Sequence, residues 1–276
     1  MSGSDATPEQ LPAWCINLDR RPDRWARMAA EAGRVGVHVE RLTAVDAIDP
    51  EVAAAAAKVE STIAGAPMSA GAFACFASHR LVWQRFLESG ESHGLVMEDD
   101  LNLSPRFARL MGRAWIPPDA DIVKLETWGS RCHVARVAAT TIDGRGVSRL
   151  LSTHIGAGCY ILSRSAAGRL VALTQRYRDP VDELLFNDRL QWFPQATIYQ
   201  LSPAAAVQGK RPHDGPGATG AAGEGWAQGS IVERFAEGAD GVEARPETLM
   251  DRVARRGREE LRAARQGSRY RVVPFA

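Results

Sequence analysis

The chain has 276 residues, of which 45% are hydrophobic and 24% are charged, a balance typical of a globular protein rather than a disordered or fibrous one. Lys and Arg number 34 against 33 Asp and Glu, so the formal net charge is +1 and no overall field attracts the chain to nucleic acid. These values argue against a nucleic-acid partner, and the length fits one catalytic domain with a tail.

The cysteines and the first residues bear on the cellular compartment. The four cysteines are Cys15, Cys75, Cys132 and Cys159. They lie far apart and form no CxxC pair, which argues against a zinc knuckle and against a disulfide framework, and fits a reducing compartment. Residues 1–10 are small and polar and do not resemble a secretory signal, and no stretch approaches the roughly 18 apolar residues that cross a bilayer. We expect a cytoplasmic protein with a disordered N-terminus at residues 1–10 and, at most, peripheral attachment to a membrane.

Strands and helices alternate in the first part of the chain. Residues 14–18 form a short apolar run with a β-branched centre, which predicts a strand, and the polar residues 19–24 predict the loop after it. A helix follows to about residue 32. Residues 40–45 predict a second strand, and the Ala-rich residues 50–59 predict a helix by intrinsic propensity.

The alternation continues to about residue 208. Helices are predicted at 69–87, with Ser69 as N-cap, and at 165–177; strands are predicted at 94–97, 121–125, 158–162 and 197–201. This order predicts an α/β catalytic domain over residues 11–208, with a mixed, mostly parallel sheet flanked by helices. Ligands bind beyond the carboxyl ends of the strands in such a sheet.

The last part of the chain differs in composition. Residues 209–229 are rich in Gly, Ala and Pro and predict a loop or linker. Residues 230–276 predict a basic helical tail, because helical spacing and many arginines coincide at 246–266. An Arg-rich helix can lie on anionic lipid at the inner face of a membrane. A solvated helix is the alternative, since Glu259 and Glu260 dilute the basic face.

Three adjacent acids, Glu98, Asp99 and Asp100, directly follow the predicted strand at 94–97. Acids confined in a cleft repel one another unless a cation compensates them, and Mn²⁺ or Mg²⁺ is the natural partner of such oxygen ligands. Alternation along an extended chain places Glu98 and Asp100 on one side as metal ligands and turns Asp99 elsewhere. The alternative is that the acids begin a solvated loop or cap a helix at 103–111.

Several separate segments, in chain order, favour the first interpretation. INLDRRPDR at 16–24 fits the pattern INLxxRxDR, and GAFACFASHRLVW at 71–83 fits GExGCxxSHxxxW. LVMEDD at 95–100, YILS at 160–163 and PVD at 180–182 come next. The closing elements are Pro203, Gln208 and the pair Ser230 and Ile231. Together these segments resemble glycosyltransferase family 25, which contains bacterial lipooligosaccharide galactosyltransferases and collagen galactosyltransferases.

The resemblance spans roughly residues 14–231 and implies a GT-A-like fold, a UDP-sugar donor, and Mn²⁺ or Mg²⁺ at the diphosphate. It also implies transfer of galactose, usually with inversion, to a glycan or glycolipid acceptor. Departures occur at four positions, Ala72, Ala74, Ala157 and Cys159. They bear on the acceptor and on fine donor preference more than on the class of reaction.

Roles for individual residues follow from the resemblance and from the chemistry of the side chains. The candidate donor-binding residues are Asn17, Arg21, Arg24, Ser78, His79 and Asp99, and the candidate metal ligands are Glu98 and Asp100. Asp182 is the candidate base for the attacking hydroxyl, and Glu126 is the second candidate.

Each role has a structural alternative. Asp182 can instead cap a helix that begins at Glu183. The two arginines can bind phosphate oxygens, but Arg21 or Arg24 can equally form an ion pair with Asp23. Ser78 and His79 lie in a predicted helix, where a core or surface role is common.

Two other functions remain compatible with the sequence. A metal-dependent nucleotidyl or phosphoryl transferase also uses acidic clusters, although the chain lacks a GxxxxGK[ST] loop. A non-catalytic nucleotide-sugar-binding protein is the third possibility, suggested by Ala72, Ala74 and Ala157.

Overall fold

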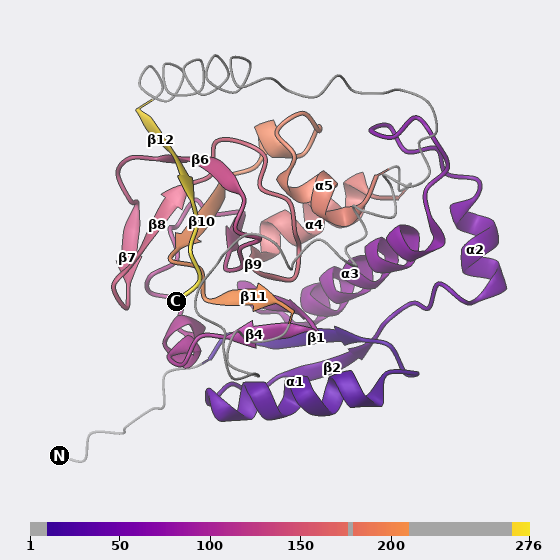
Figure 1. Ribbon diagram of the computed structural model, residues 1–276, viewed down its shortest axis with the longest axis horizontal. Coiled ribbons are helices and arrows are strands. Elements are labelled where there is room, and N and C mark those ends of the chain that lie inside the picture. The colour runs from indigo at the N-terminus through magenta and orange to yellow at the C-terminus, as the bar shows by residue number, and fades with distance from the viewer. Residues whose placement is uncertain (1–9, 176–178, 210–266) are drawn as a thin grey trace, which may run out of the picture.

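An eight-stranded β-sheet forms the centre of the protein, with strand order β2-β1-β3-β9-β5-β10-β8-β7 (Figure 1). The structure, a computed structural model, describes residues 10–175, 179–209 and 267–276. The strands of this sheet are β1 (Ala13–Asn17), β2 (Glu40–Thr43), β3 (His93–Glu98), β5 (Ile122–Lys124), β7 (Thr140–Ile142), β8 (Arg145–Arg149), β9 (Cys159–Ser163) and β10 (Ile198–Ser202). Two small sheets pair β4 (Leu101–Leu103) with β11 (Ala206–Gln208), and β6 (Arg131–Ala135) with β12 (Ser268–Val272).

The direction of the strands confirms the predicted mixed, mostly parallel sheet. β1 is parallel to both β2 and β3, and β5 is parallel to β10. β9 lies between β3 and β5 and is antiparallel to both, so β3 and β5 share one direction. Only β9 and β8 run against the other six strands, since β8 is antiparallel to both β10 and β7. The carboxyl ends of β1, β3, β5 and β10 therefore lie at one edge, which is where α/β proteins bind ligands.

Helices cover both faces of the sheet. The helices are α1 (Pro22–Arg34), α2 (Pro50–Ala56), α3 (Ala70–Ser89), α4 (Arg164–Leu173) and α5 (Val181–Phe186), with short 3-10 turns η1 (Phe107–Met111) and η2 (Phe193–Gln195). Side chains alternate across β1, so Cys15 packs in one core with α1 and η1, whereas Trp14 packs in the other with α3, α4 and α5. Continuous burial of all five β1 residues explains why the strand reads as an unbroken apolar run.

Local signals set the helix ends. Ser69 is the N-cap of α3, as predicted, and its hydroxyl accepts a hydrogen bond from the backbone N–H of Ala72. The helix ends at Gly90, which adopts φ 80°, a conformation that glycine reaches at low cost. Proline occupies the first position of α1 and of α2, where its missing N–H is harmless.

The helix at 103–111, which belongs to the alternative interpretation of the three acids, does not form over that range. β4 ends at Leu103, and the 3-10 turn η1 begins only at Phe107, with Arg106 as the preceding residue and no side-chain cap. The three acids therefore do not cap a helix. Glu98 is the last residue of β3, and Asp99 and Asp100 form the turn between β3 and β4. The short strands β6, β7, β8, β11 and β12 were not predicted either.

The last described residues, 267–276, contact the rest of the described fold. β12 pairs antiparallel with β6, and the Thr127 hydroxyl donates to the Val273 carbonyl at 2.7 Å. Residues 268–272 are thus a strand and not part of a helical tail. The predicted helix at 246–266, and the linker at 209–229 except Gly209, lie outside the described residues.

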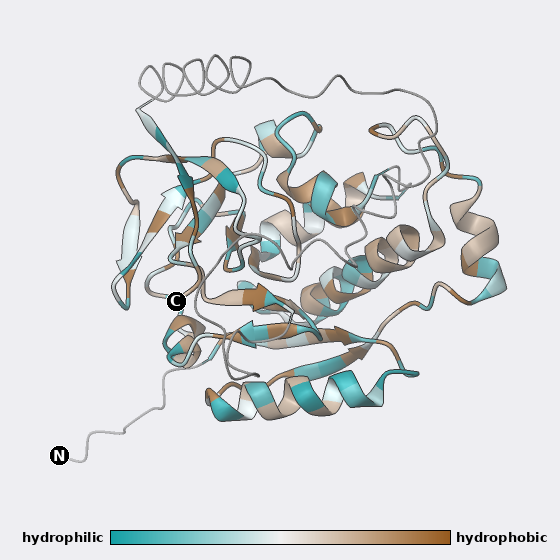
Figure 2. Cartoon of the chain, in the orientation of Figure 1, coloured by the Kyte–Doolittle hydropathy of each residue, from teal (hydrophilic) through white to brown (hydrophobic). Residues whose placement is uncertain are grey.

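Hydropathy follows this layering. α1 buries Met28 and Ala32 against the sheet and carries mostly hydrophilic residues elsewhere (Figure 2). Among the described helices, none is both long enough and apolar enough to cross a membrane.

Candidate active site

The acidic cluster lies where β3 ends, at the edge of the sheet where the carboxyl ends of β1, β3, β5 and β10 meet. Glu98 is the last residue of β3, and its side chain is 24% exposed. Gln208 Nε2 donates to Glu98 Oε2 at 3.1 Å, and His79 Nε2 lies 3.2 Å from Oε1. Burial, together with the charges of Asp182 and Asp99, raises the pKa of Glu98 from 4.5 to about 7. Because burial and neighbouring negative charges destabilise the ionised form of Glu98, a cation bound beside it would stabilise that form.

Asp99 is buried and points toward β1. Asn17 Nδ2 donates to Asp99 Oδ2 at 2.6 Å, and the Arg24 guanidinium contacts Oδ1. Asn17 in turn accepts a hydrogen bond from Arg41 Nε at 2.8 Å. These contacts fix the turn after β3 to the end of β1, so both Asn17 and Asp99 carry structural bonds in the free protein. Their role in donor binding stays a prediction.

Asp100 shares Arg24 with Asp99. Arg24 Nη2 lies 3.0 Å from Asp100 Oδ2, whereas Asp100 Oδ1 has no hydrogen-bond partner among the described residues. Burial and the negative charge of Glu98 raise the pKa of Asp100 from 3.8 to about 6. The structure therefore joins the first turn of α1 to the acidic cluster, and it leaves one buried carboxylate oxygen of Asp100 without a partner among the described residues.

The other arginine of the opening motif, Arg21, is paired with Asp23 rather than with the acidic cluster. Arg21 forms a two-pronged ion pair with Asp23, at 2.9 and 2.8 Å, and both side chains are exposed. This is the internal ion pair that the sequence left open as an alternative. Arg21 keeps a predicted role at the donor, but its guanidinium must first leave Asp23.

Ser78 and His79 are buried in α3 behind the acids. The Ser78 hydroxyl donates to the Ala74 carbonyl at 2.7 Å and accepts from the Val45 N–H at 2.9 Å, so it ties the segment after β2 to the helix. His79 contacts Glu98, and burial lowers the pKa of the imidazole from 6.5 to about 4, so the ring is neutral. Donor contact by either side chain stays untested.

The two candidate bases differ sharply in exposure. Glu126, just beyond β5, is fully buried: its Oε1 accepts from the Gly158 N–H at 2.7 Å, and Gln208 Nε2 lies 3.4 Å from Oε2. Burial raises the pKa of Glu126 to about 8, although Lys124 Nζ lies only 3.8 Å away. At neutral pH this group is mostly protonated.

Asp182 lies in the first turn of α5 and is partly exposed. The helix begins at Val181 after Pro180, and Asp182 Oδ1 accepts a hydrogen bond from the adjacent Glu183 N–H at 3.0 Å. Its charge acts on Glu98 and Lys124, which places it in the same cluster. Burial raises its pKa. An accessible carboxylate with a raised pKa is suited to accept a proton.

Two further residues of the site carry no assigned role in the sequence analysis. Gln208 bridges Glu98 and Glu126, although it was matched only as part of a closing motif. Lys124 is buried and donates to the carbonyls of Ile155 and Gly156 at 2.7 and 2.6 Å, which holds the segment before β9. A lysine at the end of a strand gives no signal in sequence, because only the fold shows that its ammonium reaches these carbonyls.

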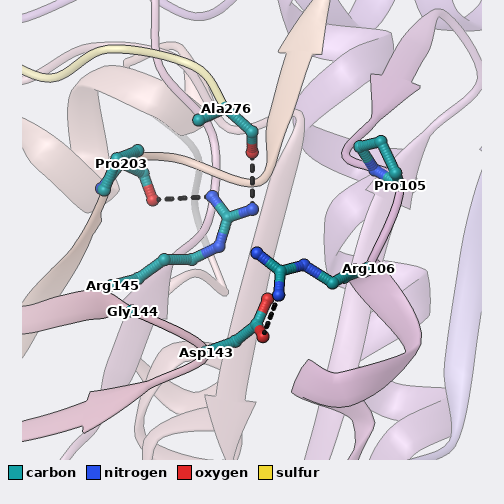
Figure 3. Close-up of a pocket in the computed structure, with 7 residues that line it drawn as sticks. All are labelled: Pro105, Arg106, Asp143, Gly144, Arg145, Pro203 and Ala276. Atoms are coloured by element: carbon teal, nitrogen blue, oxygen red, sulfur yellow. Dashed lines mark hydrogen bonds and ion pairs between the residues drawn. The ribbon is translucent and has the colours of Figure 1, made fainter.

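A separate pocket of about 310 Å³ lies between the residues after β4, the β7–β8 turn and the end of the chain (Figure 3). Its charged groups are already paired: Arg106 lies 3.1 Å from Asp143, and Arg145 donates to the Pro203 and Ala276 carbonyls. None of the predicted site residues lines this pocket.

An α/β sheet that gathers hard oxygen ligands and an arginine at its carboxyl edge defines a protein suited to phosphate-containing ligands. The family model for glycosyltransferase family 25 (LPS biosynthesis protein) matches residues 10–185. The chain belongs to this family and is a glycosyltransferase. Its substrates are, by class, a nucleotide-sugar donor and a glycan or glycolipid acceptor.

The chain is also similar to individual proteins. The lacto-N-neotetraose biosynthesis glycosyltransferase LgtB of Neisseria meningitidis serogroup B is 30% identical over 205 residues, which cover 70% of this chain and 74% of LgtB. The lipooligosaccharide biosynthesis protein lic2B of Haemophilus influenzae is 29% identical, covering 59% of this chain and 64% of lic2B. A glycosyltransferase involved in glycosylation of the major capsid of PBCV-1 aligns in structure with a TM-score of 0.44 and 9% identity, over 72% of this chain and 93% of its own.

Proposed function

We propose that this enzyme transfers galactose from UDP-galactose to a hydroxyl group of a bacterial surface oligosaccharide, with Mn²⁺ or Mg²⁺ as cofactor and with inversion at the anomeric carbon. The observation that carries the proposal is the convergence of Arg24 with Asp99 and Asp100 beside Glu98. An arginine side chain and several carboxylate oxygens thus lie together where the parallel strands of the sheet end. The predicted cytoplasmic location belongs to the same proposal.

The acids fit a hard divalent cation. Asp100 Oδ1 has no partner among the described residues, and Glu98 keeps lone pairs beyond those used by His79 and Gln208. Carboxylate oxygens are the ligands that Mn²⁺ and Mg²⁺ prefer. Glu98 and Asp100 would hold the ion, which when bound offsets the negative charge that develops on the departing diphosphate.

Arg21 and Arg24, at the start of α1, complete the donor site. Arg24 already lies at the acids and would exchange part of its ion pairing for a phosphate oxygen. Arg21 is exposed and would exchange Asp23 for the donor, because a guanidinium binds phosphate in the same two-pronged way as it binds a carboxylate.

Asp182 is the better of the two candidate bases. It is partly exposed and accepts only one hydrogen bond that the structure records, so it can reach an acceptor hydroxyl. Glu126 is buried, and both of its oxygens lie near donors. Its pKa of about 8 keeps it protonated when a base is needed. We assign Glu126 to positioning Gly158 and Gln208.

The relatives support an oligosaccharide acceptor, since their names assign them to lacto-N-neotetraose and lipooligosaccharide biosynthesis. Galactose as the transferred sugar follows from the family resemblance. Donor choice is set by few contacts, whereas acceptor sites are shaped by loops that vary on a common scaffold.

The test is a panel of UDP-sugars with Mn²⁺, with and without lipooligosaccharide fragments, read by UDP release. We expect UDP-galactose to be preferred, the product to have inverted configuration by NMR, and a chelator to stop the reaction. Asp100→Asn should lose Mn²⁺-dependent donor binding. Asp119→Asn is the matched control, because Asp119 precedes β5, at the opposite end of that strand from the acids, and bonds only to Tyr199 in the described structure. Equal turnover of other UDP-sugars, or activity unaffected by chelation, contradicts the proposal.

A further inference from the structure

One side of Glu98 faces a second group of potential metal ligands on α3. Cys75 Sγ, His79 Nε2 and Glu98 Oε1 all lie within 4.8 Å of one another. Cys75 and His79 are one helical turn apart, so both point from the same face of α3 toward the end of β3. Glu98 Oε1 lies 3.2 Å from His79 Nε2 and 3.9 Å from Cys75 Sγ.

The distances between these side-chain atoms can be compared with the separations between ligand atoms around a coordinated ion. Zinc bonds of about 2.0–2.3 Å in a tetrahedral arrangement separate neighbouring ligand atoms by roughly 3.3–3.6 Å. The two distances from Glu98 Oε1, 3.2 Å to His79 Nε2 and 3.9 Å to Cys75 Sγ, lie within a few tenths of an ångström of these separations. The third pair, Cys75 Sγ and His79 Nε2, lies within 4.8 Å and must draw closer by side-chain rotation for the three to surround one ion.

The ligand types differ from those of the Glu98 and Asp100 pair. A thiolate and an imidazole favour Zn²⁺ and similar cations, whereas Mn²⁺ and Mg²⁺ favour carboxylate oxygens. Two neighbouring sets of ligands with different preferences thus share Glu98.

The imidazole is oriented as it is at metal sites. His79 Nδ1 lies 2.9 Å from the Tyr160 hydroxyl oxygen, which also accepts a hydrogen bond from Trp83 Nε1 at 2.8 Å. A hydroxyl oxygen can accept two hydrogen bonds, so His79 can carry its proton on Nδ1 and present the Nε2 lone pair to an ion. Without an ion, the other tautomer lets Nε2–H donate to Glu98.

The site is also reachable from solvent. His79 is fully buried, but Cys75 is partly exposed and the Glu98 side chain is 24% exposed. A fourth coordination position would therefore open toward the side where Glu98 meets the acidic cluster, and a water molecule or a second ligand can fill it.

We propose that Cys75, His79 and Glu98 form a second cation site, selective for thiophilic divalent ions such as Zn²⁺, that draws Glu98 away from the Mn²⁺ site. Binding there inhibits sugar transfer, because the ion holds Glu98 Oε1 on the side of α3 and adds a second positive charge beside the Mn²⁺ site. The existence of the site is independent of the proposed function; only the inhibition rests on it.

Titration of the full-length protein with Co²⁺ tests the site directly, since a Co²⁺–thiolate bond gives a charge-transfer absorption that oxygen ligands do not give. We expect this absorption in the wild type, its removal by added Zn²⁺, and its loss in Cys75→Ala and Cys75→Ser. Cys132→Ala is the matched control, because Cys132 is a buried cysteine in β6 away from the acids, and it should keep the absorption. Absorption that is absent from the wild type, or retained in both folded Cys75 variants, overturns the proposal.

Two more variants separate this site from its neighbour. Tyr160→Phe removes the hydroxyl that orients His79 and should weaken Co²⁺ binding by roughly 10- to 100-fold. Asp100→Asn should lose Mn²⁺-dependent donor binding but keep the thiolate absorption. If the enzyme does not use UDP-galactose, the proposed function is wrong, but the Co²⁺–thiolate absorption still shows whether the cation site exists. If Zn²⁺ inhibits wild type and Cys75→Ser at the same concentration, the inhibitory role is wrong.

Discussion

Arg24 Nη2 lies 3.0 Å from Oδ2 of Asp100, and the same guanidinium contacts Asp99. This contact joins the first turn of α1 to the turn that follows β3. It lowers the repulsion among the three adjacent acids, because one positive charge lies beside two of them. Among the described residues, Arg24 is the arginine that forms ion pairs with the acidic cluster, and its guanidinium is a group that can bind phosphate.

Replacing Arg24 with Gln should weaken donor binding at least roughly tenfold, because the donor phosphates lose a charge-assisted partner. Asp99, which is nearly buried, loses its countercharge as well, so stability should fall by about 1–3 kcal/mol. Calorimetry with UDP and urea denaturation measure the two effects. Arg21→Gln is the control for stability, since its ion pair is exposed, and it should leave the urea midpoint unchanged. Unaltered UDP affinity in Arg24→Gln would remove this residue from the donor site.

Asp182→Asn should lower kcat by roughly 100- to 10,000-fold while leaving UDP binding intact, because the amide cannot accept the acceptor proton. Glu126→Gln is the matched change on the other candidate base. It should keep most of the transfer activity at pH 7, because Glu126 is already protonated there. Steady-state kinetics with saturating donor decide between them, and the reverse pattern would make Glu126 the base.

The stability contributed by Glu126 should depend on pH in a defined direction. Burial raises its pKa from 4.5 to about 8, so the folded state holds a proton that the unfolded state releases between these values. This contribution is fully present below pH 4.5 and is lost as pH rises through about 8. Glu126→Gln cannot titrate, so its stability relative to the wild type should increase from about pH 6 to about pH 9. Urea denaturation at constant ionic strength measures the difference, and a difference that does not change with pH would contradict the assigned pKa.

The sequence predicts much of this architecture because the relevant signals are local. Residues 14–18 and 94–97 are buried on both faces, so their apolar runs are unambiguous, and Ser69 is followed directly by a long helix. The meeting of Arg24 with the acids follows from two strands that are parallel and adjacent, since the loops after them emerge at the same edge.

Other features depend on contacts that no local pattern records. β12 has the sequence SRYRV, with two arginines and partial exposure, and it is a strand because β6 offers it an edge. Gln208 reaches Glu98 only through the pairing of β11 with β4. The short strands β7 and β8 bury little apolar surface of their own, so their periodicity is weak.

Gly158 is a position where a single methyl group should damage the site. A Cβ there would overlap Gln208 Nε2 and lie 2.7 Å from Glu126 Oε2, closer than any ordinary contact. Gly158→Ala should lower stability by about 1–3 kcal/mol and reduce activity, because Gln208 is displaced from Glu98. Gly168→Ala in α4 is the control: nothing lies within 4 Å of its added Cβ, and alanine favours a helix. Thermal denaturation and kinetics should separate the two, and a fully active Gly158→Ala enzyme would show that Gln208 is not needed where it lies.

Trp128 should contribute to acceptor binding. It lies two residues beyond Glu126 and is 40% exposed, unlike Trp14 and Trp83, which are core residues. Its indole packs against the backbone of Gly156, where a Cβ would overlap Nε1, so the ring is held at the rim of the site. An exposed, fixed aromatic face can stack on the apolar side of a sugar ring.

Trp128→Ala should therefore raise the KM for the acceptor by roughly 10-fold, corresponding to about 1.4 kcal/mol, without changing the affinity for UDP. Trp128→Phe keeps an aromatic face at the same position and should recover most of the loss. Kinetics with varied acceptor at saturating donor measure the effect, and calorimetry with UDP verifies that the donor site is intact. An unchanged KM for the acceptor in Trp128→Ala would show that Trp128 does not contact the acceptor. The acceptor would then bind on another side of the acidic cluster, next to the partly exposed Asp182.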